Sequence, residues 1–315
     1  MPFDDARMRS EIAHRPVVAR LQQFIAFLLV AVVAATAGYF MFLGPRSAAL
    51  LGAGVVIGGY WVGLGLEFFY LRRSYSSHPE SAPPPSQFAL AWYREMMTAP
   101  LVFLGRQPFR SSAIPDSRGD SFDSRRGVVL VHGFFCNRGL WNPWMRVLRS
   151  LNIPFRAVSL EPVFASIDEY SSAIANAVAE VQEMTRLAPV IVAHSMGGLA
   201  VRAWLAKQGA ANRVHHVVTI ATPHRGTCMA RRGFGRNVAQ MRIGSTWLSR
   251  LQTSESGSGF DGFTCFWSRC DNIVFPTDSA TLPGAQNREL AATPHVRMVY
   301  HPEVLARVMT LLDRH

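Results

Sequence analysis

The chain has 315 residues, a length that suits one sizeable domain with an additional segment. Hydrophobic residues make up 49% of it, and 32 basic against 21 acidic residues give a formal net charge of +11. The basic residues are scattered and lack a helix-turn-helix, zinc or aromatic-platform motif, so we expect no nucleic-acid partner. A membrane surface rich in anionic lipid is the counter-charge that we expect instead.

Two uncharged runs near the start of the chain predict a transmembrane helical hairpin over residues 21–71. Residues 24–43 and 48–66 carry no charged side chain, and each run has about the 20 residues that a helix needs to cross a bilayer. A cleaved signal peptide is an alternative, but the long charged leader and the second run directly behind the first argue against it.

The basic residues around these runs predict the orientation of the hairpin. They are Arg7, Arg9, Arg15 and Arg20 before the first run, Arg46 between the runs, and Arg72 and Arg73 after the second. By the positive-inside rule, residues 1–20 form a cytoplasmic N-terminal segment, and the catalytic part also faces the cytoplasm.

Residues 72–126 are expected to be a linker with one helix. A Pro/Ser stretch at 74–87 precedes residues 88–104, in which apolar residues recur at helical spacing. This helix either lies on the bilayer surface or packs on the domain that follows, and the sequence leaves both alternatives open.

Residues 127–315 show strands alternating with helices. The expected strands are GVVLVHG, FRAVSL, VIVAHS, HVVTIATP, FTCFWS and VRMVYH. Continuous apolar strands joined by helices predict an α/β domain whose mostly parallel sheet has about six strands and is covered on both faces.

The stretch IVAHSMGGLA places Ser195 where the third expected strand ends and a helix begins. A nucleophile elbow requires small residues two before and two after the serine, because the turn is tight. Gly197 meets this requirement, and Ala193 departs from the usual glycine while remaining small. Ser195 is therefore the predicted nucleophile.

An elbow also requires an oxyanion hole made of two backbone N–H groups. We expect one from Met196, the residue after the nucleophile, and one from Phe134 in the loop after the first strand. Gly133 allows the backbone to turn there, and the neighbouring His132 is expected to be structural.

The acid and the base of a triad should follow later strands. Asp271 follows FTCFWS and is preferred over its rivals Asp278 and Asp261. His301 ends the expected last strand, whereas His295 lies at the start of that strand and so at the opposite edge of the sheet. Ser195, Asp271 and His301 would then all meet at the carboxyl edge of the sheet, where parallel sheets gather reactive groups.

The motifs HGFF, AHSMGG and ATPHRGT, with the positions of Asp271 and His301, resemble bacterial α/β-hydrolase lipases and esterases. The elbow is similar to that of small Bacillus-type lipases, and residues 222–227 resemble the TPHxG segment of triacylglycerol lipases and PGAP1-like lipid deacylases. The resemblance covers about residues 127–315. It implies a minimal α/β-hydrolase domain without the first two strands of the full fold, and a supporting role for His224.

No metal or cofactor is expected for this chemistry. The four cysteines (Cys136, Cys228, Cys265 and Cys270) lack C-x-x-C spacing, and no acidic cluster suggests the calcium site found in some members of the family. Cysteines in a cytoplasmic domain would remain reduced.

Residues 224–259 combine six arginines with interleaved apolar residues. They would form either a lid or substrate rim that touches anionic lipid, or a solvated basic surface with a few core anchors.

The sequence thus predicts a multi-pass protein of the bacterial inner membrane that cleaves lipid-like carboxylic esters through an acyl-enzyme. An acyltransferase or thioesterase of the same fold remains an alternative, as does a catalytically silent membrane adaptor. The oligomeric state is left open.

Overall fold

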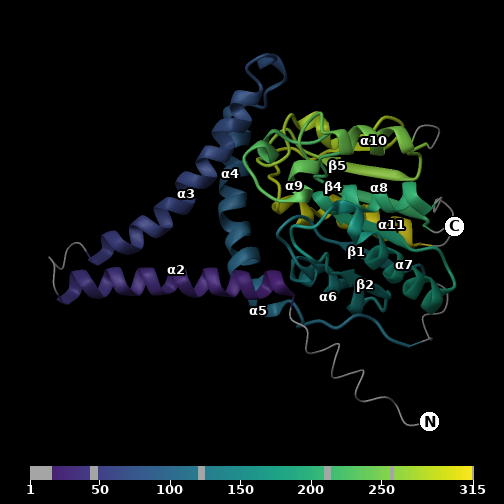
Figure 1. Ribbon diagram of the computed structural model, residues 1–315, viewed down its shortest axis with the longest axis horizontal. Helices are drawn as coiled ribbons and strands as arrows, with labels where there is room; N and C mark the ends of the chain where they lie inside the picture. The colour runs from purple at the N-terminus through teal and green to yellow at the C-terminus, as the bar shows by residue number, and fades with distance from the viewer. Residues whose placement is uncertain (1–15, 43–48, 120–124, 209–213, 256–258, 314–315) are drawn as a thin grey trace, which may run out of the picture.

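A computed structural model describes residues 16–42, 49–119, 125–208, 214–255 and 259–313. The chain forms an α/β domain and a set of N-terminal helices that project from it (Figure 1). We call these N-terminal helices, residues 17–42 and 49–110, the helical arm.

The α/β domain is built on six parallel strands in the order β2-β1-β3-β4-β5-β6. The strands are β1 (Val128–Val131), β2 (Phe155–Val158), β3 (Val190–His194), β4 (His216–Ile220), β5 (Phe263–Trp267) and β6 (Gln286–Glu289). Strands β1 to β5 match the first five expected runs, and their side chains are almost all buried because helices cover both faces of the sheet. The expected parallel sheet is confirmed.

The sixth expected strand is wrong. Residues Arg297–Tyr300 form a short 3-10 helix, and β6 lies earlier, at four polar residues that are all exposed. A polar edge strand gives no apolar signal in a sequence. The apolar run was misleading because Met298 and Val299 are buried as part of a helical turn.

Helices cover the sheet on two sides (Figure 1). One face packs against α7 (Ser171–Thr185), α8 (Met196–Gln208) and α10 (Thr246–Ser254), and the other against α6 (Asn142–Ser150) and α11 (Pro302–Leu312). The short α9 (Arg236–Gln240) lies beside α10. Each face therefore has its own apolar core.

The helical arm begins with the long helices α2 (Val17–Phe42) and α3 (Ala49–Ser74). Residues 75–84 then connect α3 to one continuous helical run. This run consists of helix α4 (Pro85–Pro100), a π-helical segment (Leu101–Arg106) and α5 (Gln107–Arg110). In Figure 1, α2 and α3 project away from the domain, and α4 runs between them along the side of the domain.

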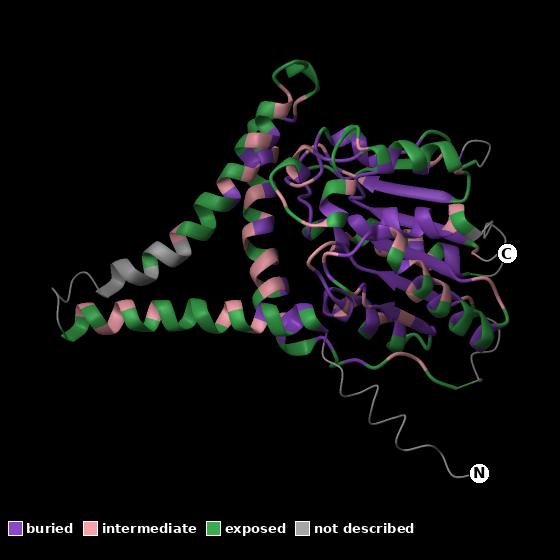
Figure 2. Ribbon diagram, viewed as in Figure 1, coloured by how far each residue is buried: buried purple, intermediate pink, exposed green. Residues whose placement is uncertain are grey.

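Helix α2 is the one described helix that is long and apolar enough to cross a membrane by length and composition, with a mean hydropathy of 2.3. None of its apolar stretch is buried, which argues against a core helix (Figure 2). Residues 1–15 and 43–48, which carry Arg7, Arg9, Arg15 and Arg46, lie outside the described residues. A second span within α3 and the orientation of the arm therefore remain predictions.

Candidate active site

Ser195 lies in the sharp turn between β3 and α8, with a φ of +54°. A non-glycine residue rarely adopts this conformation, and it presents the side chain at the top of the sheet, as a nucleophile elbow requires. The Ser195 N–H donates to the carbonyl of Ile220, the last residue of β4, at 2.8 Å. The neighbouring strand therefore holds the strained turn in place.

The small residues around Ser195 have a visible steric cause. A Cβ added to Gly197 would lie 2.5 Å from the carbonyl oxygen of His132, and one added to Gly133 would lie 2.8 Å from Cβ of Ser195. Ala193 is fully buried in β3. The loop after β1 and the elbow thus approach so closely that larger side chains would separate them.

Phe134, in the loop after β1, lines the same pocket as Ser195, and Met196 follows the serine at the start of α8. His132 stabilises this loop through two hydrogen bonds. Its Nδ1–H donates to the Gly133 carbonyl at 2.9 Å, and its Nε2 accepts from the Leu160 N–H at 3.0 Å. Burial lowers the pKa of His132 to about 4, so the ring stays neutral.

Asp271 contacts His295 and not His301. Nδ1 of His295 lies 3.0 and 3.1 Å from the two carboxylate oxygens of Asp271, and both side chains are buried. Asp271 also accepts from the N–H groups of Ile273 and Val274 at 2.9 Å each. The carboxylate is therefore fixed in its loop and can hold the imidazole in one tautomer.

His295 has a raised pKa. Burial by itself lowers the pKa of His295, but the charge and hydrogen bond of Asp271, with smaller contributions from Glu95 and Glu67, outweigh that effect. Its backbone carbonyl lies 3.4 Å from Nε2 of His194, the residue before the serine. His295 thus contacts Asp271 through its side chain and the elbow through its backbone carbonyl.

The placement of His301 corrects the sequence-based choice of base. His301 is the N-cap of α11, where its Nδ1 accepts from the Glu303 N–H at 3.4 Å. The expectation failed because β6 ends at residue 289, so the loop after the last strand is 290–296 and carries His295. Asp278 and Asp261, the rival acids, are exposed.

Ser195 and His295 line the same pocket, which has a volume of about 560 Å³. Much of its wall comes from the helical arm. The lining residues include Tyr60, Gly63, Leu64 and Glu67 of α3, Glu95 and Ala99 of α4, Phe103, Phe134, Phe135 and Ile273. Among the described residues, none from 224–259 lines it; Met241, Trp247 and Leu248 of that segment are buried in the core beside α8.

Three buried or half-buried polar residues of the arm each contact a different loop of the site. Nε2 of Gln22 in α2 donates to the Phe135 carbonyl at 3.0 Å, in the loop of the expected oxyanion hole. Glu67 in α3 accepts from Nδ2 of Asn272 at 2.6 Å, beside Asp271. Each catalytic loop therefore depends on the arm for part of its hydrogen bonding.

Glu95 in α4 makes the third contact. Its carboxylate accepts from the backbone N–H groups of Val296 and Arg297 at 2.8 and 3.1 Å, directly after His295. Burial raises the pKa of Glu95 to about 7, although these N–H groups and His295 oppose the rise. These N–H groups begin the 3-10 helix, so Glu95 acts as its cap.

Sequence reasoning missed all three arm residues, although two of them leave a signal. Glu95 is the sole acid in residues 88–104, and Glu67 directly follows the second uncharged run. A carboxylate in a mostly apolar helix needs a polar partner when it is buried, which points to a functional or structural contact.

The Thr222–Thr227 segment supports the loop that carries Asp271. Thr227 Oγ1 donates to the Ile273 carbonyl at 2.6 Å, and the Cys228 N–H donates to the Phe275 carbonyl at 2.9 Å. His224 of the same segment is buried, and its Nε2 lies 3.1 Å from Thr219 Oγ1. Burial lowers the pKa of His224. His224 thus lies in the supporting structure, away from the pocket of Ser195.

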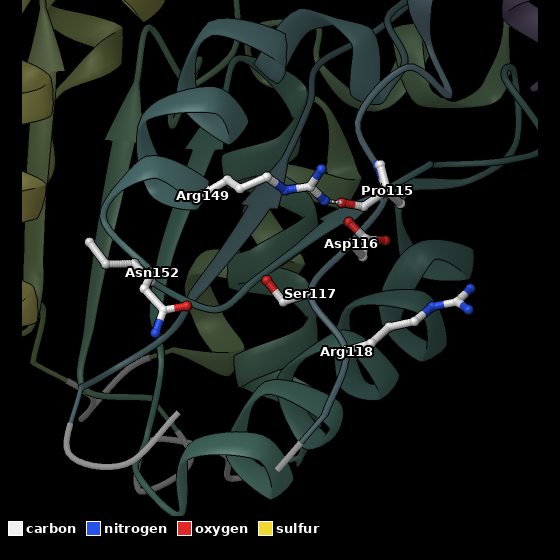
Figure 3. Close-up of a pocket in the computed structure, with 7 residues that line it drawn as sticks. Pro115, Asp116, Ser117, Arg118, Arg149 and Asn152 are labelled. Atoms are coloured by element: carbon white, nitrogen blue, oxygen red, sulfur yellow. Dashed lines mark hydrogen bonds between the residues drawn. The ribbon is translucent and has the colours of Figure 1, made fainter. Parts of the chain in front are cut away.

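The described residues contain no group of three or more His, Cys, Asp or Glu side chains that could hold a metal ion. A further pocket of about 460 Å³ lies beside residues 115–118 and the end of α6 (Figure 3). Its polar atoms stabilise the chain: Arg149 donates to the Pro115 carbonyl at 2.6 Å, and Asp116 pairs with Arg138 at 2.5 Å. It offers no catalytic group comparable to the site at Ser195.

Comparison with known proteins identifies similar sequences and folds. A model of the alpha/beta hydrolase family matches residues 128–309, whereas no curated protein matches the chain. The mature form of Bacillus licheniformis lipase BlEst2 is 16% identical, with a TM-score of 0.53, over 64% of this chain and 96% of that one. Aspergillus fumigatus lipase B is 20% identical, with a TM-score of 0.55, over 63% of this chain and 55% of that one. The similarity to these two structures is one of fold.

Proposed function

The chain belongs to the alpha/beta hydrolase family, and we propose that it is a serine hydrolase that cleaves carboxylic esters through a triad of Ser195, His295 and Asp271. The observation that carries this proposal is the buried Asp271–His295 pair in the same pocket as the elbow serine. The lipase names of the two similar structures agree with it.

In this mechanism His295 takes the proton of Ser195 as the hydroxyl attacks the ester carbonyl. Asp271 holds the imidazole in the productive tautomer and stabilises the imidazolium that forms. The backbone N–H groups of Phe134 and Met196 hold the oxyanion. His295 then returns the proton to the leaving alcohol and activates the water that hydrolyses the acyl-enzyme. These steps require only groups of this chain and water.

The proposed substrate is lipid-like and the proposed location is the inner membrane of a bacterium. The apolar walls of the pocket and the exposed apolar surface of α2 support both. We propose that α2 and α3 span the bilayer as a hairpin with the catalytic domain in the cytoplasm, as the basic residues on either side of the two runs favour. The resemblance to triacylglycerol lipases and PGAP1-like lipid deacylases is consistent with such a substrate.

The test is labelling of the full-length protein in detergent with a fluorophosphonate probe, together with hydrolysis of p-nitrophenyl esters. Ser195→Ala should abolish labelling, and His295→Asn should lower turnover by about 10³-fold or more. The matched control is His301→Asn, because asparagine preserves the N-cap of α11. Equal losses in the two histidine variants would reject His295 as the base, and a folded wild type that never labels would favour a catalytically silent adaptor.

A further inference from the structure

One face of α3 lines the pocket of Ser195. Tyr60, Gly63, Leu64 and Glu67 are spaced at i, i+3, i+4 and i+7, so they lie on the same side of the helix, and all four border the pocket. A helix that extends well beyond the catalytic domain thus forms part of the wall beside the nucleophile (Figure 1).

The wall that α3 contributes extends from Glu67 to Tyr60. Glu67 marks its catalytic end, since its carboxylate accepts from Asn272 next to Asp271. Tyr60 lies seven residues earlier, about 10 Å further along the helix axis. The pocket therefore leads from the catalytic loops along α3, towards the end of the helix that is farthest from the domain.

The wall combines a few polar groups with apolar surface. Ser195, His295, Glu67 and Glu95 lie at the catalytic loops, and the hydroxyl of Tyr60 lies further along α3, while Leu64, Ala99 and Phe103 supply apolar surface. A small number of polar groups in a pocket with apolar walls suits a ligand with one polar head and an extended hydrocarbon chain.

The other faces of α3 are also apolar. Trp61, Val62 and Leu66 are 47%, 64% and 50% exposed, and none of them lines the pocket. Large apolar side chains that remain exposed on a long helix are typical of a surface that meets lipid. The wall of the pocket and this outer surface thus belong to the same helix.

We propose that α3 forms the acyl-binding wall of the active site and that the substrate is an ester of the surrounding bilayer, whose acyl chain lies along Tyr60, Gly63 and Leu64. This inference rests on the proposed ester hydrolysis and adds the source of the substrate. It also rests on the proposed span of α3, along which a lipid tail would reach Ser195 from the bilayer.

Gly63 offers a direct test because a Cβ at this position meets no atom within 4 Å. Side chains of increasing size at residue 63 should occupy the space of the acyl chain. The control is Gly65, which has the same open surroundings on the same helix and does not line the pocket. The variants Gly63→Ala, Gly63→Val, Gly63→Leu and Gly65→Leu are compared in the full-length protein.

The readout is the ratio of palmitate to acetate ester turnover, with fluorophosphonate labelling to count active sites. We expect this ratio to fall stepwise with side-chain size at residue 63, by about tenfold for leucine, and to stay at the wild-type value in Gly65→Leu. If Gly63→Leu does not label, the alanine and valine variants decide the trend. An unchanged ratio across the series, or an equal fall in Gly65→Leu, would overturn the proposal.

A second measurement identifies the source of the substrate. Wild-type protein in nanodiscs of phosphatidylethanolamine and phosphatidylglycerol should release fatty acid, and Gly63→Val should release less per labelled site. Hydrolysis of soluble esters without release of fatty acid from the nanodiscs would reject the bilayer as the source while leaving the esterase intact. Absence of both activities and of labelling would instead refute the proposed function.

Discussion

The α/β domain and the helical arm place their apolar side chains in opposite ways (Figure 2). In the domain, the valines and isoleucines of β1 and β3 are completely buried, while in α2 large residues such as Phe24 and Val30 are about two-thirds exposed. Where the arm meets the domain, it buries apolar side chains such as Leu71 and Ala91 together with the polar side chains Gln22 and Glu95. One chain thus contains a region with a buried apolar core and a region with an exposed apolar surface, and the loops of Asp271 and His295 contact both.

Helix α4 and the π-helical segment that continues it show both behaviours. Phe88, Ala91, Glu95 and Thr98 are buried, and the opposite side carries exposed apolar residues. These exposed residues, which we call the α4 stripe, are Leu90, Tyr93, Met97, Leu101 and Leu104. Their spacing keeps them on one side of the continuous helix. Packing on the domain and lying on a bilayer, the two alternatives for this segment, therefore suit different faces of it.

The proposed triad belongs to the α/β domain, and removal of its acid is the most severe test of that assignment. Asp271→Asn should lower kcat by about 10³- to 10⁴-fold, because His295 would lose the charge that orients and stabilises it. Asp278→Asn, at an exposed acid paired with Arg225, is the control. Steady-state kinetics measures both, and similar kcat values in the two variants would contradict the assignment of Asp271.

The arm is expected to position the proposed triad, and Glu95→Gln tests this role. Glutamine retains one acceptor oxygen for the two N–H groups but removes a negative charge beside His295. We expect kcat to fall by about tenfold, because small displacements of a catalytic group are costly. Thermal unfolding should show that the variant remains folded.

The pH profile of Glu95→Gln distinguishes positioning from a loss of structure. His295 must be neutral to act as a base, so activity is lost as the pH falls through its raised pKa. Glu95, whose own pKa is about 7, contributes to that rise only while it is ionised, so its removal should move the upper part of the acid limb of kcat/KM to lower pH. The exposed linker residue gives the control Glu80→Gln, and an acid limb that is the same in both variants would refute the electrostatic role.

A smaller effect should follow from replacing two apolar side chains of the α4 stripe with polar ones. Replacing Tyr93 and Met97 by glutamine should lower turnover of bilayer esters by about threefold, because fewer apolar groups would hold the site against the lipid. Turnover of p-nitrophenyl acetate in detergent is the reference. A loss that is equal on both substrates would show that the stripe does not contact the bilayer.

The smallest expected effect concerns the basic surface at 224–259. Arg231 and Arg232 are exposed, and the Arg232 guanidinium lies 4.0 Å from the centre of the Tyr70 ring of α3. Arg231→Glu with Arg232→Glu should lower activity about twofold in nanodiscs with anionic lipid, and less at high salt. Nanodiscs of neutral lipid should show no difference, and a loss there would exclude charge attraction as the cause.

Strands β1 to β5 and the elbow could be predicted because their signals are local. Apolar runs mark the strands, and Ala193 and Gly197 mark the tight turn around Ser195. Strand β6 has no such signal, since it is polar and lies at the edge of the sheet. Without β6, the last strand is expected about a dozen residues later in the chain. His301, rather than His295, then follows its carboxyl end.

The contacts of the arm were beyond sequence reasoning for another reason. Glu95 and Val296 are separated by 201 residues, and Glu67 and Asn272 by 205. A side chain on a helix gives no indication of a partner so far along the chain, even where an isolated acid shows that a partner must exist. Only the three-dimensional arrangement connects these residues to the catalytic loops.

The Glu67–Asn272 contact has a consequence for how this chain can evolve. It joins a residue within the family match to one well before that match. Replacing either partner alone leaves a polar group without its hydrogen bond, at a cost of about 1–3 kcal/mol. Positions 67 and 272 should therefore covary among descendants of this gene, and recombination that exchanges the catalytic domain without the arm would join loops and helices that no longer match.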